Sequence, residues 1–275
     1  MNTIHDTVKA AYGRIAKGAG SCCGPVSTCC GGGGEAEALA QAVGYSTEQL
    51  AALPEGANLG LSCGNPTALA GLQPGEVVLD LGSGAGLDVF IAATKVGATG
   101  HVHGVDMTKE MVMKARQNSA AFRRRTGLEN VTFHHAQIES IPLPNASVDV
   151  VISNCVLNLS PDQPAVWREI ARVLKPGGRV SISDIVLRKP LPESVKGLVE
   201  AYVGCIAGAQ LLVDIEGWVK AAGLSEWRVE AKDEAFAGMM DSGDPLYQSI
   251  LEALPAGVKP GDYATSALLH AEKPR

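Results

Sequence analysis

From residue 76 onward, two kinds of hydrophobic pattern alternate along the chain. Short runs rich in β-branched and other apolar residues are followed by longer segments in which apolar residues recur every three or four positions. The short runs are typical of buried strands, and the longer segments of amphipathic helices. The pattern predicts strands at residues 76–81, 101–106, 131–135, 148–153 and 179–186, and helices at 88–96, 109–125 and 163–174. This alternation predicts a doubly wound α/β fold.

Two later strands are predicted around residues 227–232 and 265–271, and they would complete a seven-stranded sheet. Residues 190–223 are helical in pattern, are interrupted by glycines and are too long for a simple crossover, so we expect a lobe there. Residues 175–178, K-P-G-G, end the preceding helix and lead into the next strand. An amphipathic helix is predicted within residues 1–20, either as a docking helix or as a lid over a bound cofactor.

A glycine-rich turn follows the first predicted strand. Residues 77–88 read V-V-L-D-L-G-S-G-A-G-L-D, which places Gly82, Gly84 and Gly86 between an apolar strand and a helix. Glycines let the backbone approach a ligand, and a helix N-terminus offers free N–H groups. The spacing G-x-G-x-G, with Asp80 before it, resembles motif I of the S-adenosylmethionine-dependent methyltransferases of the Rossmann-like class. An acid at this position suits the cationic end of the methionine.

Further cofactor contacts are expected where the next strands end. Asp106 ends the second strand, where an acid accepts hydrogen bonds from ribose hydroxyls. We consider Thr108 better placed than Asp106 to cap the following helix. The loop after the third strand would frame the adenine ring. The full set of predicted cofactor-binding residues is Asp80, Gly82, Ser83, Gly84, Gly86, Asp106, Met107, Gln137, Ile138, Glu139 and Asn154.

Composition narrows the classes of function. The 275 residues are 46% hydrophobic and carry a net charge of −6, which argues against a nucleic-acid partner. We find no signal peptide and no apolar run long enough for a membrane span, so we expect a cytoplasmic protein without a membrane partner. Seven cysteines, an odd number, argue against a disulfide scaffold in a reducing compartment.

The cysteines fall on loops and lobes beside the predicted cofactor edge. Cys155 follows the fourth strand, where ligands bind in open α/β sheets. Cys63 lies in a loop and Cys205 in the predicted lobe. Three thiolates without a fourth ligand do not suit structural zinc but suit a soft, three-coordinate centre such as trivalent arsenic. Two adjacent pairs, Cys22-Cys23 and Cys29-Cys30, suit an exchanged thiophilic ion or redox cycling.

With these motifs, the sequence resembles the arsenite methyltransferase family over nearly its whole length. The matching stretches are Cys63-Gly64, residues 80–88, V-D-M-T-K at 105–109, S-N-C-V-L-N-L at 153–159, and Gly204-Cys205. The resemblance implies that Cys63, Cys155 and Cys205 hold As(III). It also implies that an N-terminal cysteine, either Cys22 or Cys23, takes part in handover or redox steps.

The resemblance further implies direct transfer of a methyl group from S-adenosylmethionine to thiolate-bound arsenite or methylarsonous acid, for detoxification. No general base is needed, and glutathione or thioredoxin would supply electrons. Two alternatives remain: a C- or O-methyltransferase of quinone-biosynthesis type, and an arsenic sensor or buffer. The implied fold is a Rossmann-like class I methyltransferase with a seven-stranded, mostly parallel sheet, helices on both faces and a helical arsenic-binding lobe. We divide it into residues 1–60 (helix and Cys-rich loop), 61–188 (cofactor domain) and 189–275 (lobe and last strands).

Overall fold

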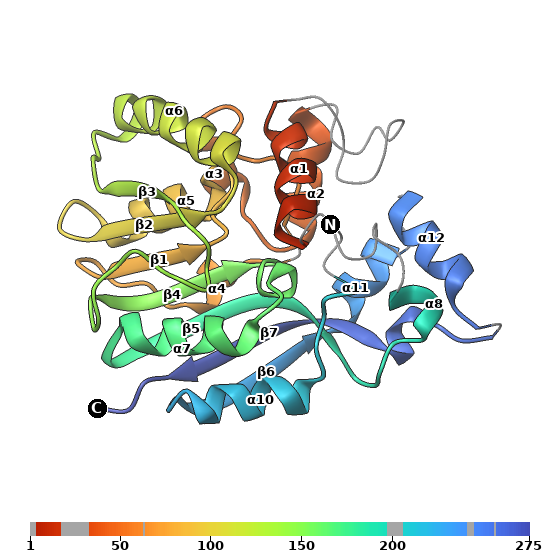
Figure 1. Ribbon diagram of the computed structural model, residues 1–275. Helices are drawn as coiled ribbons and strands as arrows, with labels where there is room; N and C mark the ends of the chain where they lie inside the picture. Colours follow the sequence, from red (N-terminus) through yellow and green to blue (C-terminus); the bar gives the residue numbers. More distant parts are fainter. Residues whose placement is uncertain (1–3, 18–32, 63, 197–205, 241–244, 256) are drawn as a thin grey trace.

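A computed structural model describes residues 4–17, 33–62, 64–196, 206–240, 245–255 and 257–275. Among these residues, seven strands form one sheet in the order β3-β2-β1-β4-β5-β7-β6 (Figure 1). The strands are β1 (Val77–Leu81), β2 (His101–Asp106), β3 (Val131–His135), β4 (Val148–Asn154), β5 (Leu174–Leu187), β6 (Ser225–Lys232) and β7 (Ala264–Glu272). The seven strands predicted from hydrophobic periodicity are therefore confirmed.

The sheet is parallel from β3 to β5 and antiparallel at β7. The chain builds β1, β2 and β3 toward one edge and then returns to place β4 on the other side of β1. This reversal leaves a crevice at the carboxyl ends of β1 and β4, where open α/β sheets bind ligands. The topology therefore puts a ligand site beside the glycine-rich turn.

Strand β5 begins earlier than predicted. It starts at Leu174, and the K-P-G-G stretch that we expected to connect helix and strand belongs to it. Gly177 donates its N–H to the carbonyl of Lys273 at 2.8 Å, and the Lys273 N–H donates to Gly178 at 2.8 Å. Backbone pairing with the far end of the chain therefore extends the strand through residues with low strand propensity.

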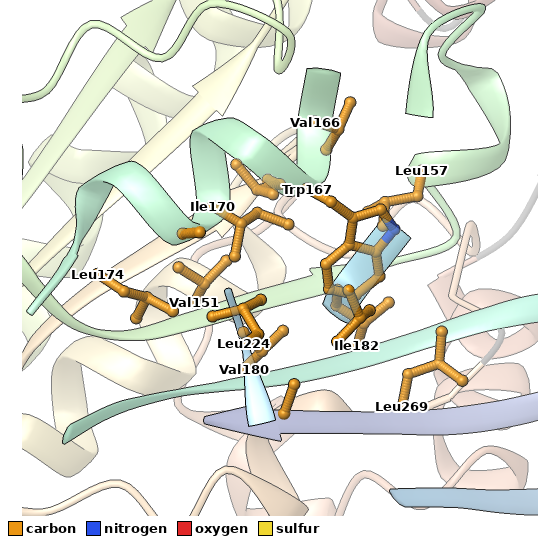
Figure 2. Packing of buried hydrophobic residues seen from close by; sticks show 14 of the residues in the cluster. Val151, Leu157, Val166, Trp167, Ile170, Leu174, Val180, Ile182, Leu224 and Leu269 are labelled. Atoms are coloured by element: carbon orange, nitrogen blue, oxygen red, sulfur yellow. The ribbon is translucent and has the colours of Figure 1, made fainter. Parts of the chain in front are cut away.

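Helices cover both faces of the sheet. One face carries α5 (Leu87–Val96) and α6 (Lys109–Thr126), and the other carries α7 (Gln163–Val173) and α10 (Leu212–Ala221). In α7 the apolar residues recur at helical spacing, and Trp167 is fully buried among them. Figure 2 shows Trp167 packed with Ile170 over the sheet residue Ile182. Burial of such a large side chain contributes about 1.5–3 kcal/mol or more to folding.

A third apolar cluster lies at the carboxyl end of the sheet. It unites Val8 of α1 (Ile4–Ala16), Val195 of α8 (Glu193–Lys196), Phe236 of α11 (Asp233–Met240) and Ile250 of α12 (Pro245–Ala253) with Cys155. Figure 1 shows these helices gathered at the end of the sheet toward which the arrows of β1 and β4 point. Of these helices, α8, α11 and α12 follow residue 189 and contribute to the cluster that contains Cys155. The predicted arsenic-binding lobe stays a prediction.

The remaining described elements are further α-helices and 3-10 helices. They are α2 (Gly33–Ala42), α3 (Thr47–Ala51), α4 (Pro66–Leu69), η2 (Leu157–Leu159) and η3 (Pro260–Asp262). Asn65 caps α4, since its Oδ1 accepts the N–H of Ala68 at 3.0 Å. Within the described parts of the chain, no helix has both the length and the apolar character that crossing a bilayer requires.

Candidate active site

One cavity opens at the carboxyl ends of β1, β2 and β4, and α1 covers it with His5, Val8 and Tyr12. Most of the predicted site residues in the described part of the chain line this cavity. They are Asp80, Gly82, Ser83, Gly84, Asp106, Met107, Ile138, Glu139, Asn154 and Cys155. Gly86 and Gln137, which we also predicted to contact the cofactor, are not among its lining residues.

The glycines of the turn have different roles. Gly82 has a φ of 68°, and a Cβ there would lie 2.2 Å from Cγ2 of Val156, so this glycine lets the turn pack against the residue after Cys155. Gly86 has a φ of 100°, and its Cβ would lie 2.6 Å from the Phe90 ring. Gly86 therefore serves the packing at the start of α5, which explains its absence from the cavity wall.

Asp106 joins the glycine turn to the start of α6. Its Oδ1 accepts the N–H of Thr108 at 2.7 Å, and its Oδ2 accepts the N–H of Gly84 at 2.9 Å. Thr108 occupies the N-cap position of α6, but its side chain makes no capping hydrogen bond. The expected position of Thr108 at the start of the helix is therefore confirmed, but its side chain does not cap, and Asp106 accepts the backbone N–H of Thr108. The predicted contact of Asp106 with ribose stays a prediction.

Buried carboxylates give the cavity an acidic end. Asp80 and Asp88 are 3% and 5% exposed. Burial raises the pKa of Asp80 well above its usual value, and the nearby charges of Asp88 and Asp106 raise it further. Burial raises the pKa of Asp88 to about 6, although hydrogen bonds from Tyr45 and Asn154 lower it. A cation bound here would relieve the mutual repulsion of these groups.

Tyr45 and Asp88 form a buried pair that the sequence analysis missed. The Tyr45 hydroxyl donates to Oδ1 of Asp88 at 2.8 Å. Burial, followed by the charge of Asp88, raises the pKa of Tyr45 well above its usual value, so the phenol stays a donor. Asp88 stands at the start of a helix, where an acid normally faces solvent, and nothing local to Tyr45 indicates its partner.

Cys155 lies on the turn after β4 and is 5% exposed. Its φ of 54° is in the left-handed region, which is unusual for a residue with a side chain. Its N–H donates to the carbonyl of Ser183 at 2.8 Å, and its sulfur is part of a disulfide. Because a thiolate is the metal-ligating form, binding through this sulfur requires reduction first.

The other predicted cysteine ligands lie outside the described residues. They are Cys22, Cys23, Cys63 and Cys205, together with the Cys29-Cys30 pair. In the part of the chain that the structure describes, no group of three or more His, Cys, Asp or Glu side chains is arranged to hold a metal ion. The predicted trio of cysteines therefore stays a prediction.

A buried polar network supports the Cys155 turn from behind. Oδ1 of Asp184 accepts from the Asn158 side chain at 2.8 Å, and its Oδ2 accepts the N–H of Leu157 at 3.1 Å. Gln163 Nε2 in turn donates to Asn158 Oδ1 at 3.1 Å and to the Gly208 carbonyl at 3.3 Å. The network thus links the Cys155 turn to the backbone at Gly208, three positions after Cys205.

Helix α1 is attached to the loop after β3. His5 Nε2 lies 3.0 Å from Oε1 of Glu139, and its Nδ1 lies 3.1 Å from Nε2 of Gln137. Ser160 also donates to Oε1 of Glu139 at 2.5 Å. Gln137 therefore contacts α1 without itself lining the cavity. These contacts hold α1 over the cavity, which favours the interpretation of α1 as a lid.

Comparisons with known proteins decide the family. Residues 72–243 match the family described as "Methyltransferase domain". A crystal structure of an arsenic(III) S-adenosylmethionine methyltransferase from Chlamydomonas reinhardtii superimposes with a TM-score of 0.61 and 31% identity, covering 86% of this chain and 73% of that one. This chain belongs to the arsenite methyltransferase family. Its fold is the predicted Rossmann-like class I methyltransferase fold.

Two curated arsenite methyltransferases extend the likeness. The protein from Halobacterium salinarum is 41% identical over 98% of this chain, and the one from Aquipseudomonas alcaligenes is 34% identical over 82%. The chain spans 66% of the length of the first and 63% of the second. The "Methyltransferase domain" match includes the glycine turn, Asp106 and Cys155, so it covers this side of the cavity, whereas the lining residues of α1 precede it.

Proposed function

We propose that this chain transfers the methyl group of S-adenosylmethionine to trivalent arsenic held by cysteine thiolates. The observation that carries the proposal is the position of Cys155, which lines the same cavity as the glycine turn in a member of this family. Arsenite and methylarsonous acid are the proposed substrates, because both are soft, thiophilic centres. The whole protein's role would be arsenic detoxification.

The residues present fit S-adenosylmethionine. Asp80 and Asp88 place buried carboxyl groups beside the glycine turn, and the cofactor carries a sulfonium and an ammonium group, which would favour their charged form. The buried hydroxyl of Ser83 makes no hydrogen bond to the described residues, so it is available to a ligand. Ile138 and Met107 provide apolar wall for an adenine ring. When bound, the cofactor would supply an electrophilic methyl group.

The chain's own contribution is to bind and orient. Cys155, Cys63 and Cys205 would hold the arsenic through sulfur, so that its lone pair faces the methyl donor. Arsenic loses no proton in this reaction, and accordingly the residues need not act as a general base. The Asp184 network and Gly82 keep the Cys155 turn against the glycine turn. Positioning is therefore the main catalytic effect.

A thiol reductant completes the proposal. Reducing the Cys155 disulfide takes two electrons and two protons and leaves two thiols. Methyl transfer also uses the arsenic lone pair, so each methylated product must gain two electrons before it is trivalent again. Glutathione or thioredoxin would supply them. Cys22 and Cys23 would relay arsenic or electrons, rather than hold the arsenic during transfer.

The test is a direct assay of methyl transfer. The full chain is incubated with S-adenosylmethionine, glutathione and arsenite, and arsenic species are separated by chromatography with mass detection. We expect methylated arsenic and S-adenosylhomocysteine in matching amounts, and neither from Cys155→Ser. Arsenite binding without any methyl transfer would support a sensor or buffer instead. Neither binding nor transfer would overturn the proposal.

A further inference from the structure

The backbone at Gly64 rests on two neighbouring strands. Asn154 of β4 pairs in register with Ser183 of β5, so their side chains leave the same face of the sheet. Asn154 Nδ2 donates to the Gly64 carbonyl at 2.7 Å. A Cβ on Gly64 would lie 2.0 Å from Oγ and 2.9 Å from Cβ of Ser183. Only glycine permits this approach, because the two strands leave no room for a side chain.

The residues that follow Gly64 are held in the same way. Ser181, two positions before Ser183 on β5, donates its hydroxyl to the Pro66 carbonyl at 3.0 Å. Asn65 Nδ2 donates to the Gly44 carbonyl at 2.9 Å. The 64–66 segment is therefore fixed on two sides, against the sheet and against the turn that carries Tyr45.

The Asn154 amide also reaches the acidic end of the cavity. Its Nδ2 lies 3.0 Å from the Tyr45 hydroxyl and 3.4 Å from Oδ2 of Asp88. Asn154 and Asp88 line the cavity, whereas Gly64 and Ser183 are not among its lining residues. One amide group thus links the wall of the cofactor cavity to the backbone at Gly64. Gly64 is covalently bonded to Cys63, one of the proposed arsenic ligands.

We infer that Asn154 is a positioning residue: it fixes residues 64–66, which follow the proposed ligand Cys63, against β4 and β5. We call this contact of residues 64–66 with the two strands the seat, and it depends on the absence of a side chain at Gly64. The inference rests on the proposed function, since it concerns a proposed arsenic ligand. When the backbone next to a ligand residue is already fixed, less conformational freedom is lost on arsenite binding. Loss of the seat should therefore weaken arsenite binding while the cofactor cavity stays intact.

Gly64→Ala tests the seat without touching the cavity wall. Gly64 does not have a positive φ, so alanine is compatible with its backbone conformation and only the contact with Ser183 is affected. Arsenite affinity is measured by equilibrium dialysis of the reduced full-length protein with metal detection, and S-adenosylmethionine affinity by calorimetry. We expect arsenite to bind roughly tenfold or more weakly. We expect cofactor affinity to change less than about twofold.

Recovery of arsenite affinity in a double variant distinguishes loss of the seat from a general loss of folding. Ser183→Gly removes both atoms that a Cβ on Gly64 would meet, so the double variant Gly64→Ala/Ser183→Gly should recover most of the arsenite affinity. Ser183→Gly alone is the matched control: it keeps the hydrogen bonds of Asn154 and Ser181 to residues 64–66, and its arsenite affinity is the reference for the double variant. Thermal unfolding of all three variants checks that they fold. A double variant as defective as Gly64→Ala would overturn the inference.

A second pair of variants tests the amide itself. Asn154→Asp keeps the shape of the side chain but loses the donors to Gly64 and Tyr45, so we expect weaker arsenite binding. Tyr45→Phe removes only the hydroxyl and should affect arsenite less than Asn154→Asp does. Normal arsenite binding by both Gly64→Ala and Asn154→Asp would refute this inference and leave the proposed function standing. Failure of the wild type to bind arsenite would instead refute the proposed function.

Discussion

The Asp184 carboxylate on β5 accepts a hydrogen bond from the Asn158 side chain at 2.8 Å, directly behind the turn that carries Cys155. Both groups are buried, at 2% exposure each. The turn contains a residue with φ of 54°, so the network offsets local backbone strain. A buried polar pair that is not among the cavity-lining residues therefore supports the turn that carries one of the lining residues, Cys155.

Asp184→Ala should destabilise the fold by about 1–3 kcal/mol, because buried donors on Asn158 and Leu157 lose their acceptor. Urea unfolding measures this change. Burial raises the pKa of Asp184 from 3.8 to about 7, so its contribution to stability is present below pH 3.8 and is lost as the pH rises through about 7. Asp184→Asn keeps one acceptor oxygen and should cost less than alanine. Equal stability of the wild type, Asp184→Ala and Asp184→Asn would show that these hydrogen bonds do not stabilise the fold.

Asp106→Ala should weaken S-adenosylmethionine binding by about 1–3 kcal/mol, measured by calorimetry, because the N–H groups of Gly84 and Thr108 lose their acceptor and the glycine turn loosens. Asp106→Asn, which keeps one acceptor oxygen, should lie between alanine and the wild type. Unchanged affinity in the alanine variant would show that this carboxylate does not organise the cofactor site.

The three proposed ligands should differ in their substrates. Arsenite offers three positions to sulfur, whereas methylarsonous acid offers two because carbon occupies the third. Cys155→Ser and Cys205→Ser should abolish methylation of both substrates, since serine does not replace a soft thiolate. Cys63→Ser should lose arsenite methylation and keep methylation of methylarsonous acid. Assays of both substrates decide this, and full arsenite activity in any of the three variants would refute the trio.

His5→Ala should release α1 from the cavity, because the ring lies 3.0 Å from Glu139 and 3.1 Å from Gln137. We expect bound S-adenosylmethionine to dissociate several-fold faster in stopped-flow measurements. Arg14→Ala, an exposed position on the same helix, is the matched control. Equal dissociation rates in His5→Ala and the wild type would favour a docking helix over a lid.

Half-buried histidines on β2 and β3 should make the fold sensitive to acid. His103 Nδ1 lies 3.1 Å from Nε2 of His134. Burial, followed by the charges of His101 and His134, lowers the pKa of His103 from 6.5 to about 4. Its contribution to stability is therefore present above pH 6.5 and is lost as the pH falls through about 4.

The variant His103→Gln should flatten the fall in melting temperature between pH 6.5 and 4. Melting temperatures at pH 8, where the ring is neutral in the folded and unfolded states, give the separate cost of changed packing. An acid dependence identical to that of the wild type, after this correction, would assign the sensitivity to other groups.

The alternating pattern from Val77 onward predicted the strands, the helices and the doubly wound fold class, because the central strands are buried on both faces and are therefore apolar along most of their length. The glycine turn and Asp106 could also be predicted, because each is recognised from residues that are adjacent in the sequence. Cys155 could be placed because it directly follows a predicted strand, and the carboxyl ends of parallel strands share one edge.

Contacts between distant segments were decided only by the tertiary structure. Tyr45 and Asp88 are 43 positions apart, and Asn154 meets Gly64 across 90 positions, so no local period brings them together. The early start of β5 depends on backbone hydrogen bonds to Lys273. The role of Gly86 depends on its close approach to the Phe90 ring. A sequence pattern records which face of an element is buried. It does not record which polar groups meet there, because folding pairs each buried donor with whatever acceptor the packing brings within reach.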